Sequence, residues 1–435
     1  MLEGQLEQAV HCSVMEQAST QSTIVVTVSA DLVTTLYNYI VRCHKRHSSI
    51  AGFVPGTVPI DYIERNFKTS ICEQVKDFIS TFFVQQSLFT EIMRKKIILL
   101  GNPDLRIVSI KAHQPAIFTF SINHLPLNIY ANWKPLPFRA PNRKNYRDLD
   151  HQVTTFLHEE TARVANHSPN IMSNDWVAFT ISPLDEEQQS LFGSQHRAQL
   201  WLKVSNEETD HEQYDTIKQR TLHETFTTQA RFLQEYYNAS YDTQYQFAVG
   251  ITHHSKNHFF CIDTFKRHFK IKTARELHQK LIEVFSFRHD VSQRRETAEM
   301  VLRLLLKHNP FSIAPEIVEA QEARILEIIY HNPDYYVYKG QEDFPDKVHT
   351  LALKQLKEAA IVAAIAYTEN IQITPQDMLS YLNLMKRPRT KEFIYFNLPN
   401  TSRNERQLPI HDQELYHNCL LEKTLNHIIY TLTRK

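Results

Sequence analysis

Glycine is scarce in this chain, and that scarcity constrains the fold more than any other feature of the sequence. Seven of the 435 residues are glycine, yet two of them, Gly52 and Gly56, fall within a ten-residue stretch that begins at Ile50. Pro55 and Pro59 lie in the same stretch. Glycine reaches backbone conformations with positive φ that other residues avoid, while proline holds φ at about −65°. The pattern therefore predicts a preshaped loop.

Both flanks of this loop predict helices. Apolar residues recur at helical spacing before and after it, and the upstream segment ends in a basic cluster, which favours a helix C-terminus. We call Arg42, Lys45 and Arg46 of this cluster the collar. Phe53 stands between the two helices, so we expect its side chain to be exposed. A basic tip of this kind suits nucleic acid or an acidic protein patch, and an ordinary helix–helix turn with a solvated end is the alternative.

The remaining sequence excludes several kinds of chemistry. Loops that cradle phosphate or dinucleotides need more glycine than this chain carries. The five cysteines are scattered without zinc-finger or disulfide spacing, and the neighbouring His253, His254, His258 and Cys261 have no second cluster to complete a metal site. We therefore expect no cofactor and no metal, and the catalytic residues are unknown.

Charge and hydropathy limit the classes of partner and the cellular compartment that we expect for this protein. Lys+Arg and Asp+Glu number 48 each, so no overall field favours a polyanion or a membrane, and any such contact must be local. The N-terminus lacks the basic and apolar regions of a signal peptide, and the longest apolar run is about half of what a membrane helix needs. We expect a cytoplasmic protein without a membrane partner.

The hydrophobic pattern predicts a multidomain α+β protein. After a polar N-terminal tail at residues 1–22, strand patterns and the two helices predict an α+β domain over residues 23–122. Residues 123–147 carry prolines and basic residues without an acidic one, which is typical of an extended connector. Residues 148–256 alternate short strands with helix and predict a small α+β domain. Residues 257–435 predict amphipathic helices throughout.

Residues 52–59 read Gly-Phe-Val-Pro-Gly-Thr-Val-Pro and resemble the Gly-Phe-Arg-x-Gly-Lys-x-Pro signature of trigger factor, a bacterial ribosome-bound folding chaperone. Val54 and Thr57 stand where the signature has cations. Three segments of the C-terminal half are also similar to trigger factor: residues 263–277, 311–320 and 369–375. The chain is identified as a divergent member of that family.

The resemblance implies three functional parts: an N-terminal ribosome-binding domain, an FKBP-like middle domain and an all-α C-terminal chaperone domain. Nascent and unfolded polypeptides would be the clients, and the sequence leaves a weak homodimer open. The loop would meet the large ribosomal subunit near the tunnel exit, contacting protein and rRNA, while the collar supplies charge. The residues assigned to this docking loop are Gly52, Phe53, Val54, Pro55, Gly56, Thr57 and Pro59.

Two alternatives to a ribosome-bound chaperone stay open. The family's middle domain is a peptidyl-prolyl cis-trans isomerase, so the chain could be a working isomerase, or it could be an assembly or interaction protein that acts away from the ribosome. The family's aromatic–Ile–Pro–Gly turn and Phe-Pro-Glu-x-Tyr run are both missing from residues 148–256, so the middle domain reads as degenerate. Its aromatic residues either line a pocket or fill a core. They are Trp176, Phe179, Trp201, Tyr214, Phe226, Tyr245 and Phe247.

Overall fold

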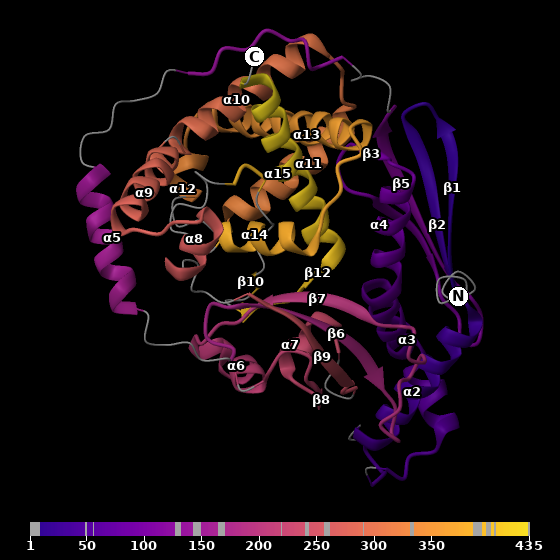
Figure 1. The fold of residues 1–435 in the computed structure, drawn as a ribbon. Coiled ribbons are helices and arrows are strands. Elements are labelled where there is room, and N and C mark those ends of the chain that lie inside the picture. Colours follow the sequence, from indigo (N-terminus) through magenta and orange to yellow (C-terminus); the bar gives the residue numbers. More distant parts are fainter. Residues whose placement is uncertain are drawn as a thin grey trace.

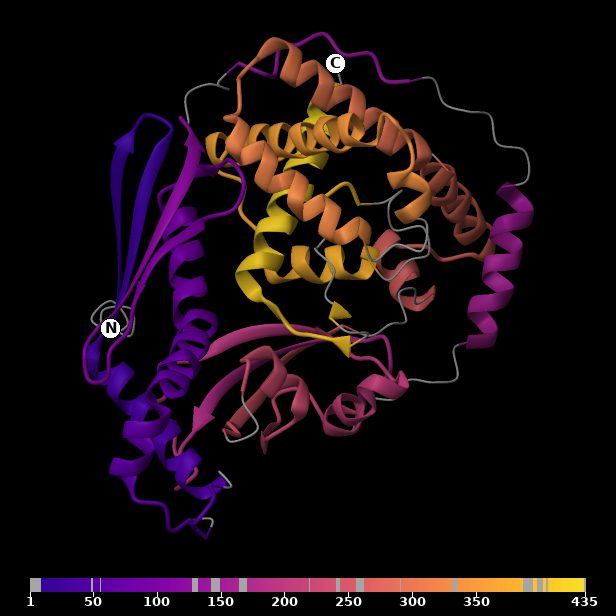
Figure 2. The ribbon, with the colours of Figure 1, turned by 180° about the vertical axis from the view of Figure 1, so that it is seen from behind.

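The chain forms an N-terminal part, a middle part and a helical C-terminal half. The N-terminal part lies beside the other two, as the opposite views of Figure 1 and Figure 2 show. The computed structural model confirms the α+β class, with a sheet in the N-terminal part, a second sheet in the middle and helices in the C-terminal half. It describes residues 9–47, 50–54, 56–126, 132–141, 149–163, 170–218, 220–239, 243–255, 262–289, 291–330, 335–385, 394–396, 402–403 and 406–433.

The N-terminal sheet is antiparallel and covers its helices with one face. Its order is β1-β2-β5-β3, and β4 also pairs with β5. Alternate residues of the central strands point inward, so Ile24, Val26 and Val28 are fully buried. The strands are β1 (Val10–Ala18), β2 (Gln21–Val28), β3 (Ile98–Leu99), β4 (Asp104–Ser109) and β5 (Ala116–Leu125).

Strand β1 corrects the prediction of a polar tail at residues 1–22. Val10 pairs with Val28 of β2, and the pairing continues to Ala18. The strand lies at the edge of the sheet, and Val10 is its one buried residue. An edge strand of this kind does not need the alternation of apolar and polar residues that marks a half-buried strand, so the sequence pattern misses it.

One helical hairpin, formed by residues 30–47 and 60–84, carries the loop that the sequence assigns to docking. We call it the docking hairpin. Helix α2 (Ala30–His47) leads into the loop, and α3 (Ile60–Ile79) leads away from it. Helix α3 continues without a break through the π-helical turn η1 (Ser80–Val84) into α4 (Gln85–Arg94). The basic residues that end α2 stand where the helix dipole favours cations, as the sequence indicates.

The middle sheet is completed by a strand from the far end of the chain. Its order is β12-β7-β6-β9-β8, and β12 (Ile410–His411) pairs with β7. The other strands are β6 (Trp176–Leu184), β7 (Ala198–Lys203), β8 (Thr225–Thr228) and β9 (Gln246–Ser255), and the short helical elements are η3 (Glu208–Asp210), α6 (His211–Ile217) and α7 (Arg231–Tyr236). The middle part is therefore not built from residues 148–256 alone.

Helix α5 (Leu149–Arg163) lies with the C-terminal helices although the predicted middle domain includes it. Its Val153 is fully buried in one cluster with Leu277 and Leu281 of α9. The helical period of α5 indicates an apolar face but not the part of the chain that the face packs against.

The C-terminal half is helical, as predicted, except for short strands between residues 402 and 411, which correct the prediction of an all-α domain. Pro315 and Pro375 begin α11 and α14, where the missing N–H of proline leaves no helical hydrogen bond unmade. None of the helices in the described part of the chain combines the length and apolar character that crossing a membrane requires. The helices are α8 (Ile262–Phe269), α9 (Ala274–His289), α10 (Val291–His308), α11 (Pro315–Tyr330), α12 (Tyr335–Lys339), α13 (Phe344–Thr368), α14 (Pro375–Met385) and α15 (Asp412–Thr433). A two-stranded ribbon, β10 (Ser402–Arg403) and β11 (Arg406–Gln407), precedes β12.

An aromatic interface joins the docking hairpin to the middle part. The Phe78 ring lies 4.9 Å from the Tyr237 ring and 4.7 Å from the Tyr245 ring, measured between centroids. Phe192 contacts Phe82 and Phe83 in the same way. All six rings are buried. Aromatic pairs at these separations add to the free energy gained from burying their area. We call these six residues the aromatic interface.

The connector also packs on the helices rather than crossing solvent freely. Trp133 is almost fully buried in the core that α10, α13 and α15 share, and its ring makes an edge contact with His427. Lys134 forms an ion pair with Glu369 at 2.7 Å. From the N-terminal domain, the Lys96 ammonium donates to Asn370 Oδ1 at 2.6 Å. The N-terminal part is thus held against the helical half at a second place.

His411 lies where the three parts meet. It belongs to β12, pairs with Leu200 of β7, and donates from its ring Nε2 to the Thr81 carbonyl oxygen of η1 at 2.9 Å. Its neighbour Asp412 accepts a hydrogen bond from the Trp201 indole nitrogen at 2.8 Å. Burial lowers the pKa of His411 from 6.5 to about 4, although its hydrogen bond to Thr81 acts in the opposite direction.

We predict that His411 weakens the fold in acid. The unfolded chain takes up this proton at about pH 6.5, whereas the folded protein excludes it until about pH 4. The free energy of unfolding should therefore fall as pH drops from about 6.5 to 4, by about 3 kcal/mol from this residue. Denaturant unfolding at several pH values measures the effect. His411→Phe should flatten the slope over this range, while the exposed control His47→Phe should keep it. Parallel slopes for His411→Phe and the parent would contradict the prediction.

Candidate functional site

The docking loop is shaped by its own backbone hydrogen bonds. The Phe53 N–H donates to the Ile50 carbonyl at 3.1 Å, and the Gly56 N–H donates to the Lys45 carbonyl in the last turn of α2 at 3.0 Å. Thr57 donates to the Val54 carbonyl from its N–H at 3.0 Å and from its hydroxyl at 2.7 Å. These bonds hold the turn before any partner binds.

Both loop glycines adopt the backbone that the sequence predicts. Gly52 has φ +91° and Gly56 has φ +86°, and a Cβ atom at either position would meet nothing within 4 Å. The requirement for glycine is therefore conformational and not a matter of space. Pro59 is extended and forms the N-cap of α3, where its carbonyl accepts the Tyr62 and Ile63 N–H groups. Pro55 lies outside the described residues.

The loop presents apolar side chains to solvent. Phe53 is 36% exposed and Val54 is 68% exposed, whereas Val58 is fully buried beneath them. The Phe53 ring lies 5.1 Å from the Tyr62 ring of α3. Tyr62 supports one side of Phe53 and leaves the rest of the ring accessible. This geometry fits an aromatic group that inserts into a pocket of a partner.

The collar is not a free cluster of cations. Arg46 forms an ion pair with Glu186 of the middle part, and Arg42 Nε lies 3.8 Å from the same carboxylate oxygen. Lys45 is half-buried, and no ion pair joins it to another described residue. The sequence places the three cations at the mouth of the loop, but it does not indicate the carboxylate that two of them share.

The aromatic residues of the middle part fill a core. Trp176, Phe179 and Trp201 are each at most 3% exposed. Tyr245 and Phe247 are also buried, and Tyr245 belongs to the aromatic interface. Tyr214 and Phe226 are half-buried, with the Arg220 guanidinium 4.3 Å from the centre of the Phe226 ring. These residues leave no open aromatic pocket among the described part of the sheet, although prolyl isomerisation needs one to desolvate the imide.

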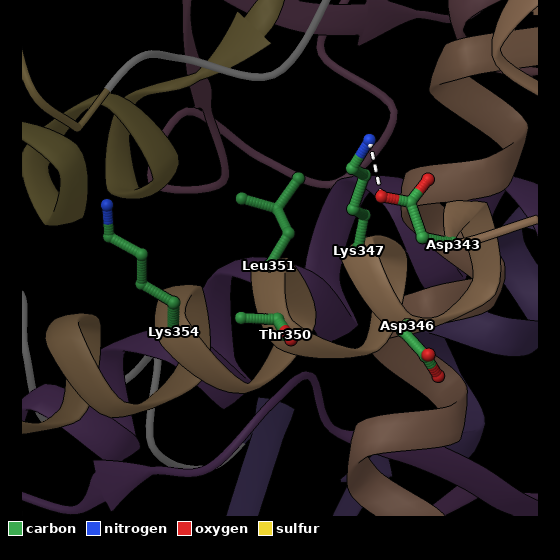
Figure 3. Close-up of a pocket in the computed structure, with 6 residues that line it drawn as sticks. All are labelled: Asp343, Asp346, Lys347, Thr350, Leu351 and Lys354. Atoms are coloured by element: carbon green, nitrogen blue, oxygen red, sulfur yellow. Dashed lines mark ion pairs between the residues drawn. The ribbon is translucent and has the colours of Figure 1, made fainter. Parts of the chain in front are cut away.

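The described residues offer little for other chemistry. They contain no group of three or more potential metal ligands. Burial raises the pKa of the Cys43 thiol to about 11 and that of Cys12 to about 12, so neither is a thiolate at neutral pH. A shallow depression of about 360 Å³ lies on α13 (Figure 3). There Lys347, Leu351 and Lys354 point to one side, and Lys347 pairs with Asp343 at 2.9 Å.

Large apolar side chains are also exposed on α11 and α12. Ile328, Tyr336 and Val337 are 64%, 75% and 69% exposed, values unusual for such large apolar side chains. Leu326, Tyr330 and Tyr338 are exposed close to them in sequence. We call these six residues the helical tip. Polar groups edge it, among them Lys339, which lies 5.6 Å from the centre of the Tyr335 ring.

Comparison with known families identifies the N-terminal part. Residues 11–151 match the family model described as bacterial trigger factor protein, a class of folding chaperones. This N-terminal part of the chain therefore belongs to the trigger factor family, which confirms the resemblance drawn from the loop signature. The match begins inside β1, in agreement with the sheet that starts before residue 23.

Solved structures also align with this chain. A trigger factor chaperone, studied for promiscuous substrate recognition in folding and assembly, aligns over 97% of this chain and 99% of its own at 12% identity and a TM-score of 0.36. That score is below the level at which two overall folds are equated, so the family assignment rests on residues 11–151. No curated protein matches the chain.

Sequence reasoning missed three contacts at the site. Glu186 lies in an acidic turn that reads as a solvated loop, Tyr62 reads as an ordinary member of a helical face, and Thr57 reads as a lost cation. The Thr57 hydroxyl instead bonds the loop to itself. A Ser or Thr hydroxyl that donates to the carbonyl three residues earlier is a known local pattern, so only the Thr57 contact has a sequence rule that would have found it.

We predict that the intact protein does not accelerate prolyl isomerisation. The aromatic residues that would surround the imide are packed in the core or against the docking hairpin. A protease-coupled assay with Xaa-Pro peptides should give the spontaneous rate, set by a barrier of about 20 kcal/mol. Acceleration that disappears in a folded Phe226→Ala variant would contradict this expectation and would place a pocket beside the half-buried aromatics.

Proposed function

We propose that this protein is a ribosome-associated chaperone of trigger-factor type. It docks on the large ribosomal subunit near the tunnel exit through residues 50–59 and holds unfolded segments of nascent chains on its helical half. The trigger factor domain at residues 11–151 supports the chaperone role. The observation that carries the docking is the preshaped loop, in which two glycines with positive φ present a partly exposed Phe53.

Docking would combine an apolar contact with a reduced electrostatic one. Phe53 and Val54 form the apolar contact, and the collar lies directly behind them because Gly56 bonds to the Lys45 carbonyl. Val54 and Thr57 provide no charge, so fewer phosphate contacts form than the family signature implies. The affinity for the ribosome then depends more on Phe53 than it would with the family signature, and it is less sensitive to salt.

The helical tip is the surface that we assign to clients. Exposed apolar groups edged by polar ones bind unfolded segments without sequence selectivity. The large exposed side chains on α11 and α12 meet this description, and no described element covers them. Isomerase activity is the second candidate function, and no observation on the middle part favours it.

We predict that Phe53→Ala reduces ribosome association about 30-fold. An aromatic group that inserts into a partner's pocket contributes about 2 kcal/mol or more, and every 1.4 kcal/mol is a tenfold change. Co-sedimentation with ribosomes at two salt concentrations measures the loss. Leu105→Ala on β4 is the matched control, because Leu105 is similarly exposed in the same domain. Equal binding of Phe53→Ala and the parent at both salt concentrations would show that the loop is not the docking element.

Restoring a cation to the loop tests the electrostatic half of the proposal. Val54→Arg is the cleaner variant because Val54 is exposed and its side chain has no hydrogen bond to lose. Thr57→Lys also removes the hydroxyl bond to the Val54 carbonyl. Val54→Arg should bind ribosomes more tightly and steepen the dependence of log K on log salt by about 0.7. An unchanged slope would argue against phosphate contact at this position.

We predict that the helical tip suppresses aggregation. Ile328→Ser combined with Val337→Ser removes exposed apolar area without opening a cavity, so the fold should be kept and client binding weakened. Light scattering of a diluted unfolded protein should show at least about half of the protection lost. Met15→Ser with Ile107→Ser removes two apolar side chains that are more than half exposed on the N-terminal sheet and should leave protection intact. Equal loss in both pairs would mean that protection does not depend on the tip.

The tip is a better target than deletion of the middle domain. Removing residues 148–256 would take Phe192, Tyr237 and Tyr245 away from the docking hairpin and expose Phe78 and Phe82. Such a protein would offer a new apolar surface, so its activity would not report on the native client surface. Point variants at exposed positions avoid this difficulty.

A further inference from the structure

The acidic turn at residues 185–189 is held in one shape by its own hydrogen bonds. Asp185 accepts the Glu187 and Gln189 N–H groups on Oδ1, each at 2.9 Å, and its N–H donates to the Gln189 carbonyl at 2.8 Å. The Gln188 side-chain amide bonds to that of Gln246 on β9 at 3.0 Å. The turn follows β6 and presents Glu186 to the collar.

Two collar arginines share the carboxylate of Glu186. Arg42 and Arg46 are one helical turn apart, so their side chains leave α2 on the same face. Glu186 Oε1 pairs with Arg46 and lies 3.8 Å from Arg42 Nε. Arg42 also donates from Nε to the Asn38 carbonyl at 3.3 Å. The shared carboxylate therefore lies beside the loop and neutralises part of the charge that would face a ribosome.

A carboxylate and a phosphate bind to the same N–H donors of an arginine. The guanidinium binds either anion through a fork of N–H donors, so one occupies the place of the other. RNA phosphate that binds Arg42 and Arg46 therefore competes with Glu186 for their N–H donors. We propose that Glu186 is an intramolecular competitor for RNA phosphate at the collar, through which the middle part lowers the affinity of the docking loop for ribosomal RNA. The inference rests on the proposed docking function.

The competition is graded and not a block. Exposed ion pairs are weak and are screened by salt, so Glu186 reduces phosphate binding a few-fold without abolishing it. One carboxylate pairs with two of the three collar cations, which leaves the collar positive. The inference gives the middle part a role in ribosome binding that needs no catalytic activity from it.

The test compares two charge-neutralising variants of the full chain. A fluorescent uridine oligonucleotide is titrated with the parent, Glu186→Gln and Glu187→Gln over a series of salt concentrations. Glu187→Gln removes the same formal charge from the same turn, and no ion pair joins Glu187 to the collar among the described residues. Glu186→Gln should bind about fivefold more tightly than the parent and steepen the salt slope by about 0.7, while Glu187→Gln stays within about twofold. In an Arg42→Gln/Arg46→Gln background, Glu186→Gln should have no effect.

Two outcomes would overturn the inference. Equal tightening by both variants would assign the effect to net charge, and unchanged binding of Glu186→Gln would remove the competitor. Ribosome co-sedimentation of the same proteins separates this result from the proposed function. Tighter oligonucleotide binding by Glu186→Gln without co-sedimentation of any variant would leave the competitor standing and refute docking. Co-sedimentation of the parent, with Glu186→Gln binding like the parent in both assays, would support docking and refute the competitor.

Discussion

The aromatic interface is the contact on which the rest of the structure depends. Phe78, Phe82 and Phe83 belong to the N-terminal helices, and their partners lie in loops of the middle part, one of them directly after α7. Beneath the rings, the Thr243 hydroxyl donates to Gln74 Oε1 at 2.6 Å, which satisfies a polar pair that burial would otherwise penalise. This contact and the pairing of β12 with β7 therefore hold the middle part to both of its neighbours.

This interface explains why the aromatic residues of the middle part do not line an open pocket. An isomerase pocket needs aromatic rings that face an open space, whereas a docked domain needs them at its contact surfaces and core. Tyr245 and Tyr237 face the docking hairpin, and Trp201 bonds to Asp412 beside β12. The middle part therefore uses its aromatic side chains for attachment, and it reaches the collar through the ion pairs of Glu186.

Local structure was predictable from the sequence, and long-range pairing was not. Proline at a helix start placed α11 and α14, and the rare glycines indicated the positive φ values of the loop. The two-residue strand β12 has no period to detect, and it reaches β7 across a large separation in sequence. The same holds for Glu186 and Arg46, because single charges on two surface segments carry no sign of their partner.

The unbroken helix from α3 through η1 to α4 determines a distance within the molecule. At about 1.5 Å per residue it spans roughly 50 Å, with the docking loop at its start and Lys96, which contacts Asn370, just beyond its end. A helix of this kind resists bending far more than a linker does. The regular rise of this helix therefore sets the spacing between the loop at residues 50–59 and the contact with the helical half.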